Sequence, residues 1–135
     1  MALILDTGVV YASYDRRDRW HRGSVELLKR EPGELIVPAA VIPEVDHLLR
    51  RRLGSEAQLL FYRGLSDGAY YVADLPREGY SRVLEINTRF RDLGLGFVDA
   101  AVLAIAEMLD LRRVATTDRR HFGVVKDYLR LELLP

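Results

Sequence analysis

Short apolar segments alternate with longer helical patterns along this chain, and this alternation limits the fold more than any other feature of the sequence. Parallel strands are joined by helical crossovers, so the alternation is typical of an α/β domain with a largely parallel sheet. The predicted strands are Ala2 to Leu5, Leu35 to Val37, Tyr70 to Ala73, Arg113 to Thr116 and Leu129 to Leu134.

The segments between these strands carry helical spacing of their apolar residues. The last helix, from Phe97 to Leu109, is apolar on almost all sides, and such a helix is typically central and buried. The predicted helices are Gly8 to Tyr14, Trp20 to Glu31, Ala39 to Leu53, Glu56 to Leu65, Arg77 to Phe90 and Phe97 to Leu109.

The length of 135 residues fits one compact domain, residues 1–135. The absence of cysteine excludes disulfides and thiolate metal sites. The sequence has no signal-peptide pattern and no apolar run of the roughly 20 residues that a membrane span needs, so we expect a cytoplasmic protein without membrane contact. Lys+Arg and Asp+Glu both number 20. Any binding of nucleic acid must therefore rely on local basic clusters rather than on net charge.

Four acidic residues lie where a predicted apolar element begins or ends. Asp6 follows the first strand, and Asp118 follows the fourth. Glu44 lies in the first turns of the third helix, and Asp99 lies in the first turn of the apolar helix. Ligands of open parallel sheets bind beyond the carboxyl ends of the strands. We therefore expect these four side chains to meet at one edge of the sheet.

Asp99 constrains the chemistry of this edge most strongly. Its helical neighbours Val102, Leu103 and Ala106 are apolar, so an unpaired carboxylate there would lose solvation at a cost on the order of several kcal/mol. A divalent cation would pair with it. Because the chain has no cysteine and three histidines, oxygen ligands and a hard cation, Mg²⁺ or Mn²⁺, are the natural choice.

Each acid taken alone also has an ordinary structural explanation. Asp6 is typical of a helix N-cap, and Asp118 of a turn residue. Asp99 in a first turn favours the helix dipole, and Glu44 fits an exposed helical surface. These explanations account for the acids one at a time, and they do not account for four acids at one predicted edge.

Four short segments resemble the motifs of PIN domains in their order and spacing. They are Leu3 to Gly8, Ile42 to Val45, Gly94 to Ala101 and Ala115 to Phe122. The resemblance covers nearly the whole chain, and it is strongest to VapC-type toxins of toxin–antitoxin pairs. It implies a three-layer α/β/α sandwich with a mostly parallel central sheet of four to five strands. At one position the chain departs from the family, because Gly8 stands where many members carry a small polar residue. Thr7 offers a hydroxyl that can compensate.

The resemblance further implies metal-dependent hydrolysis of RNA phosphodiester bonds. Asp6, Asp99 and Asp118 would bind Mg²⁺ or Mn²⁺, and Glu44 would bind the metal through water or orient the attacking water. Thr117 can donate a hydrogen bond to a carboxylate or a phosphate, or face solvent. The candidate substrate-binding residues are Thr117, Arg16, Arg17, Arg119 and Arg120.

The family also implies a homodimer and a protein antitoxin that covers the site. The apolar helices between Val41 and Leu65 can supply these surfaces, or their apolar residues can simply fill the core of this domain.

Three other functions remain to be weighed. A receiver-type signalling domain needs an acidic pair after the first strand and a late lysine, whereas this chain offers Asp6 alone and places Lys29 and Lys126 elsewhere. A dehalogenase-like phosphatase needs a second aspartate where Gly8 stands. A PIN-fold module that binds RNA without cleaving it stays open.

Overall fold

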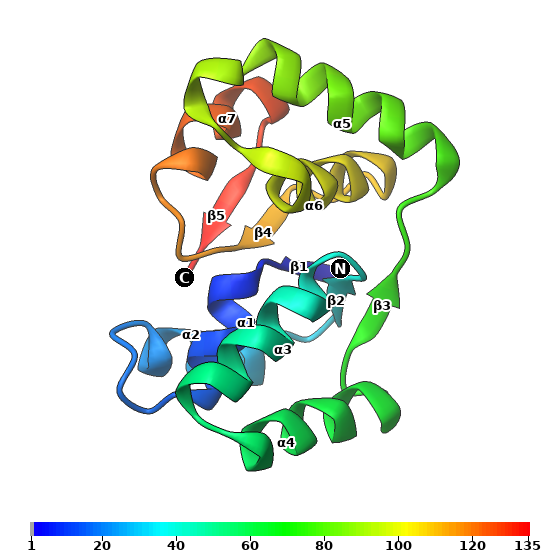
Figure 1. Cartoon of the computed structure of the whole chain (residues 1–135). Helices are drawn as coiled ribbons and strands as arrows, with labels where there is room; N and C mark the ends of the chain where they lie inside the picture. Colours follow the sequence, from blue (N-terminus) through cyan, green and yellow to red (C-terminus); the bar gives the residue numbers. More distant parts are fainter. Residues whose placement is uncertain (1) are drawn as a thin grey trace.

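A computed structural model describes residues 2–135 of the chain. Within this range, parallel strands form one 5-stranded sheet in the order β3-β2-β1-β4-β5 (Figure 1). The predicted α/β class and the parallel sheet are therefore confirmed. The strands are β1 (Ala2–Leu5), β2 (Glu34–Pro38), β3 (Tyr71–Ala73), β4 (Arg113–Ala115) and β5 (Glu132–Leu134).

Helices cover both faces of this sheet, as a three-layer α/β/α sandwich requires. Helices α1 to α4 lie on one face, and α5 to α7 lie on the other (Figure 1). Right-handed crossovers place them there, because the chain moves from β1 to β3 in one direction across the sheet and then returns to β4 and β5. Over residues 2–135, no helix combines the length and the apolarity that crossing a bilayer takes. The helices are α1 (Thr7–Tyr14), α2 (His21–Arg30), α3 (Val41–Arg52), α4 (Ser55–Ser66), α5 (Arg77–Arg89), the short 3₁₀ helix η1 (Arg91–Leu93), α6 (Gly96–Met108) and α7 (His121–Leu129).

The direction of the chain across the sheet reverses at the pair of strands β1 and β4. The crossover that leaves β1 leads to β2 on one side, whereas β4 lies on the other side of β1. The connections after β1 and β4 therefore leave the sheet on opposite faces, and the carboxyl ends of such a strand pair are where open parallel sheets form their ligand-binding crevice. Asp6 follows β1 directly, so the fold places the first predicted acid at this crevice.

The core lies on both sides of the central strand. Leu3, Ile4 and Leu5 are fully buried, as expected for a parallel strand covered by helices on both faces. Every residue of α6 from Ala100 to Ala106 is also buried. Phe97 and Leu109 are exposed. The predicted burial of the apolar helix is therefore confirmed for its middle and wrong for its ends.

The predicted last strand, from Leu129 to Leu134, begins too early. Its first residue, Leu129, ends helix α7 (His121–Leu129), which the sequence patterns did not predict, and the strand is limited to Glu132–Leu134. Phe122 and Val125 are buried at helical spacing in this segment, for which no helix was predicted. Arg130 then adopts a left-handed φ of 55°, which ends the helix and turns the chain into β5.

Candidate active site

Asp6 lies between the two central strands at their carboxyl ends. Its backbone N–H donates to the carbonyl of Ala115 at 2.9 Å, which continues the pairing of β1 with β4. Its Oδ2 accepts a hydrogen bond of 2.8 Å from Oγ1 of Thr116. Asp6 is 5% exposed and Thr116 is fully buried. Asp6 stands at the N-cap position of α1, but its side chain makes no capping hydrogen bond, so helix capping does not explain this carboxylate.

The burial of Asp6 makes its charge costly. Desolvation raises the pKa of Asp6 to about 7, and the nearby charges of Asp99 and Asp118 add to the effect, whereas the hydrogen bond from Thr116 opposes it. A bound cation would favour the charged form of this carboxylate. Asp6 is thus a strong candidate for a metal ligand on physical grounds.

Asp99 is presented by the first turn of α6. This helix begins at Gly96, whose φ of 85° favours glycine. Asn87 of α5 holds this turn, because its Oδ1 accepts from the Gly96 N–H at 3.0 Å and its Nδ2 donates to the Gly96 carbonyl at 3.2 Å. Burial raises the pKa of Asp99, and the charges of Asp118 and Glu44 add to this, while a hydrogen bond with His121 lowers it.

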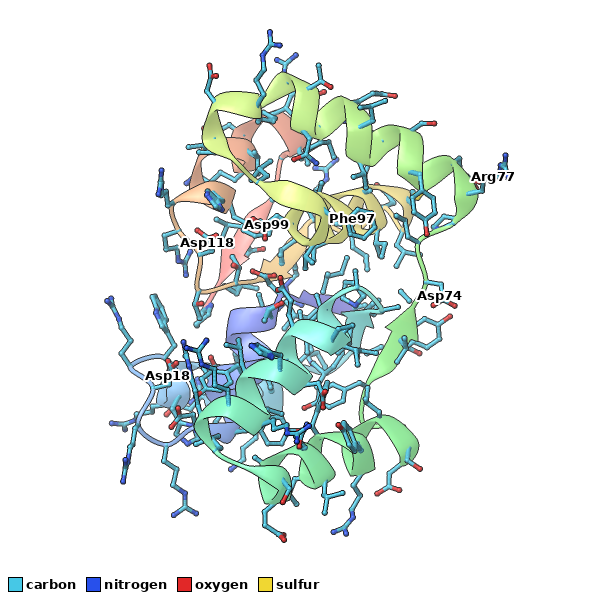
Figure 2. The ribbon with its side chains drawn as sticks, in the orientation of Figure 1. Asp18, Asp74, Arg77, Phe97, Asp99 and Asp118 are labelled. Atoms are coloured by element: carbon cyan, nitrogen blue, oxygen red, sulfur yellow. The ribbon has the colours of Figure 1, made fainter. Side chains whose placement is uncertain are left out.

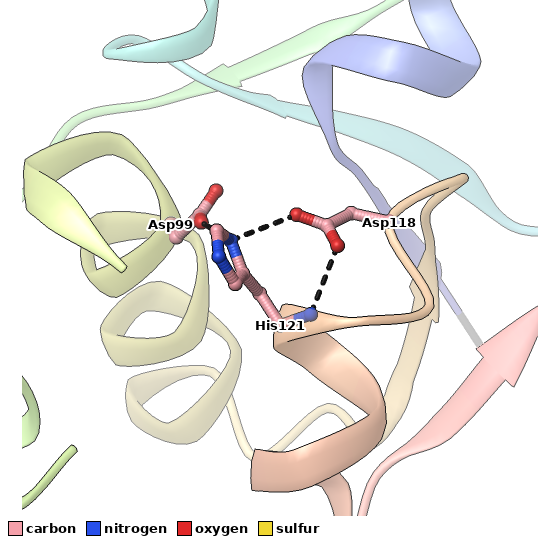
Figure 3. Close-up of side chains that lie close together, drawn as sticks. All are labelled: Asp99, Asp118 and His121. Carbon is pink, nitrogen blue, oxygen red and sulfur yellow. Dashed lines mark hydrogen bonds and ion pairs between the residues drawn. The ribbon is translucent and has the colours of Figure 1, made fainter. Parts of the chain in front are cut away.

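The two carboxylate oxygens of Asp118 make different contacts. Oδ1 accepts a hydrogen bond of 2.9 Å from the backbone N–H of His121, which holds the start of α7. Oδ2 lies 3.0 Å from Nδ1 of the His121 ring (Figure 3). The turn explanation of Asp118 therefore describes one of its oxygens and leaves the other available in the site.

Glu44 approaches the site from the first turn of α3. Its Oε1 accepts a hydrogen bond of 2.7 Å from Oγ1 of Thr7, the first residue of α1. Its charge raises the pKa of Asp99, which places the two carboxylates within electrostatic reach of each other. The side chain is exposed, as the surface explanation expected, yet its charge still acts on Asp99.

The structure thus brings Asp6, Asp99 and Asp118 within electrostatic reach of one another beyond the carboxyl ends of β1 and β4, and Glu44 within reach of Asp99. Figure 2 shows Asp99 and Asp118 close together, where α6 faces the segment that follows β4. Ligand atoms of Asp99, Asp118 and His121 lie within 4.8 Å of one another, a spacing that suits one cation. Mutual repulsion of the carboxylates and the burial of Asp6 both favour a bound positive charge. The donor set fits an oxygen-rich divalent metal site.

Comparison with known proteins agrees with this geometry. The family model described as PIN domain matches residues 3–127.

The chain belongs to the PIN domain family.

It is 30% identical to Ribonuclease VapC26 of Mycobacterium tuberculosis over 124 residues, and this alignment covers 92% of each protein.

Solved structures share the fold at lower identity. VapC20 of Mycobacterium tuberculosis, described as a sarcin-ricin loop cleaving toxin, matches with a TM-score of 0.77 at 20% identity over 83% of this chain and 86% of its own. FitAcB of Neisseria gonorrhoeae matches with a TM-score of 0.73 at 15% identity, over 98% of this chain and 96% of the FitAcB chain. VapBC2 of Rickettsia felis matches with a TM-score of 0.72 at 16% identity, over 98% of this chain and 97% of the matched chain. Membership of the PIN family excludes the receiver-type and dehalogenase-like alternatives.

The glycine at position 8 of this PIN domain has a packing explanation. A Cβ added to Gly8 would lie 2.1 Å from Oγ1 and 3.3 Å from Cβ of Thr117. The side chain of Thr117 thus occupies the space that a larger residue at position 8 would need. Thr117 packs against α1 at the edge of the site, and its contact with substrate stays a prediction.

The predicted arginines lie on two segments of the PIN domain. Arg119 stacks over Trp20 at 5.6 Å from the ring centroid and donates a hydrogen bond to the carbonyl of Pro135. Arg120 is exposed directly before α7. Arg16 and Arg17 are exposed in the segment between α1 and α2. Their contact with RNA stays a prediction.

Sequence reasoning missed three residues that organise the site: Thr116, Asn87 and His121. Thr116 carries a weak signal, since it is a hydroxyl residue at the end of an apolar strand. His121 follows Asp118 at helical spacing, which a correct prediction of α7 would have shown. Asn87 carries no local signal, because its partner Gly96 lies on another element.

Proposed function

We propose that this PIN domain is a VapC-type endoribonuclease that depends on Mg²⁺ or Mn²⁺ and serves as the toxin of a toxin–antitoxin pair. The observation that carries the proposal is the cluster of Asp6, Glu44, Asp99 and Asp118 at the crevice between β1 and β4. The 30% identity to Ribonuclease VapC26 over 92% of both chains supports the same activity.

Each acid has a role in this proposal. Asp6, Asp99 and Asp118 hold the metal, which when bound lowers the pKa of its water and neutralises charge on the phosphate. Thr116 orients Asp6 through its hydrogen bond, and Thr7 orients Glu44 in the same way. Glu44 is exposed enough to hold a water against the phosphate. Because Asp6 retains its proton more readily than an ordinary aspartate, metal binding displaces that proton.

The RNA backbone is held by basic residues at the rim of the crevice. Arg119 and Arg120 follow Asp118 directly, so a phosphate at the metal lies within reach of this segment. Arg16 and Arg17 extend the positive surface from the α1–α2 segment, and Thr117 supplies a hydroxyl at the edge. Contacts of this kind give affinity without reading the base sequence.

An antitoxin and a second copy of the chain complete the proposal. Structures with the same fold include a toxin–antitoxin complex from Klebsiella pneumoniae, with a TM-score of 0.72. Val41, Val45 and Leu49 fill the core, whereas Leu59 and Leu60 of α4 are 53% and 54% exposed. The α3–α4 pair therefore serves the core and also leaves apolar surface for a partner. We place the protein and its antitoxin in the cytoplasm, where RNA is the substrate.

The test is cleavage of RNA by the purified protein with Mg²⁺, with Mn²⁺ and with EDTA. We expect cleavage with either metal, none in EDTA, and none by Asp99→Asn, which keeps the size of the side chain and removes its charge. Circular dichroism checks that this variant is folded. Retained cleavage in EDTA contradicts the metal mechanism. RNA binding without cleavage under every metal condition would identify the chain as a binding module instead.

A further inference from the structure

The ring of His121 lies inside the acidic cluster rather than beside it. Its Nδ1 is 3.1 Å from Oδ2 of Asp99 and 3.0 Å from Oδ2 of Asp118 (Figure 3). Its own backbone N–H bonds to the other oxygen of Asp118 at 2.9 Å, so main chain and side chain are both anchored to this residue. The ring is thereby held between two of the proposed metal ligands.

One hydrogen bond does not account for both contacts of this nitrogen. A ring nitrogen carries at most one proton, yet two carboxylate oxygens lie at contact distance from the same Nδ1. The contact with Asp99 has hydrogen-bond geometry, whereas the contact with Asp118 is an ion pair by distance. The two carboxylate oxygens therefore share at most one N–H of the ring, and Oδ2 of Asp118 accepts no separate hydrogen bond from it.

A shared cation could be bound by all three atoms, Nδ1 of His121 and Oδ2 of Asp99 and of Asp118. In an octahedral site with bonds of about 2.1 Å, neighbouring ligand atoms lie about 3.0 Å apart. The nitrogen-to-oxygen distances of 3.0 and 3.1 Å match such neighbouring positions. The ligand atoms of the three residues already lie within 4.8 Å of one another.

We propose that His121 is a direct nitrogen ligand of the divalent cation, together with Asp99 and Asp118, and that this ligand makes the site prefer Mn²⁺ to Mg²⁺. The inference rests on the proposed metal-dependent function and refines it. Mg²⁺ favours a shell of oxygen atoms, whereas imidazole nitrogen suits first-row transition metals. One nitrogen among the carboxylates thus shifts selectivity without removing the oxygen-rich character of the site.

The test measures metal binding directly, without RNA. Pulsed electron paramagnetic resonance on the Mn²⁺-loaded protein detects a directly bonded nitrogen through its nuclear coupling. We expect this coupling in the wild-type protein and its loss in His121→Ala and His121→Gln. Both variants keep the backbone N–H that bonds to Asp118, so the start of α7 is retained. His47→Ala is the matched control, because His47 is an exposed histidine on α3. It should keep the coupling.

Calorimetric titration provides the second readout. We expect His121→Ala to weaken Mn²⁺ binding by roughly 10- to 100-fold, as loss of a metal-site residue does, and to change Mg²⁺ binding by less than about threefold. If Mn²⁺ binds the wild-type protein without nitrogen coupling, His121 is not a metal ligand. If His121→Ala weakens the binding of Mn²⁺ and Mg²⁺ equally, His121 does not set the metal preference. Both results overturn the role of His121 and leave the proposed function standing. Failure of the wild-type protein to bind either metal overturns both.

Discussion

Thr116 donates a hydrogen bond of 2.8 Å from Oγ1 to Oδ2 of Asp6, although the two residues lie 110 positions apart in the sequence. The parallel pairing of β1 with β4 brings them side by side, with Leu5 opposite Ala115 in the register. This bond favours the charged form of a buried carboxylate that burial otherwise disfavours. In the proposed metal site, Thr116 would thereby prepare Asp6 for a cation.

Removal of the Thr116 hydroxyl should weaken metal binding. Thr116→Val keeps the shape of the side chain but leaves Asp6 without this donor, so the pKa of Asp6 rises further. We expect Mg²⁺ and Mn²⁺ affinity to fall by roughly 10-fold, in line with other partners of metal ligands. Calorimetric titration measures the effect. Thr116→Ser restores the hydroxyl and should recover most of the affinity, and unchanged affinity in the valine variant would show that the bond has no such role.

The metal-free protein should lose stability as pH rises from about 4 to about 8. The folded protein holds the pKa of Asp6 at about 7, above the value of 3.8 expected without burial. The folded state therefore binds more protons in this window than the unfolded state, and the free energy of unfolding falls with rising pH. The raised pKa corresponds to at most about 4 kcal/mol, and the raised pKa of Asp99 acts in the same direction.

Urea unfolding in EDTA at several pH values measures this dependence. We expect Asp6→Asn to remove much of it and to be more stable than the wild-type protein at pH 8 by roughly 1–3 kcal/mol. The difference should shrink near pH 4.5. A wild-type stability that increases between pH 5 and pH 8 in EDTA contradicts the buried-carboxylate explanation.

A side chain at position 8 should disturb the site through Thr117. Gly8→Ala places a Cβ 2.1 Å from Oγ1 of Thr117 unless that hydroxyl rotates away. We expect a loss of roughly 1–2 kcal/mol in the free energy of unfolding, despite the better helix propensity of alanine. The double variant with Thr117→Ala should lose less than the sum of the two single variants. Additive losses would show that the two residues do not compete for space.

The turn that presents Asp99 should depend on Asn87. Asn87→Ala removes both hydrogen bonds to Gly96 and leaves the start of α6 free to shift. We expect the free energy of unfolding to fall by roughly 1–3 kcal/mol and metal affinity to fall with it. Thr88→Ala is the neighbouring control, since Thr88 bonds only to the Leu84 carbonyl of its own helix. If both variants bind metal with the same affinity, Asn87 does not contribute to metal binding.

Much of the fold could be predicted from local patterns. Composition and spacing over a few residues are enough to predict β1, β2, β4 and the apolar middle of α6. The helix α7 could not be predicted in this way because it is short, and nine residues are too few to show a clear helical period. Where each acid stands relative to its own element was predictable for the same local reason.

The sequence by itself determined where the four candidate acids stand: one at the end of β1, one after β4, and one in the first turn each of α3 and α6. Only the tertiary structure decided which side chains meet. The reversal of strand order placed Thr116 beside Asp6, the packing of α5 on α6 placed Asn87 on Gly96, and the start of α7 placed His121 between two carboxylates. Periodicity reports the conformation of a segment over one or two turns. Contacts between distant segments depend on strand order and helix packing, which no local pattern records.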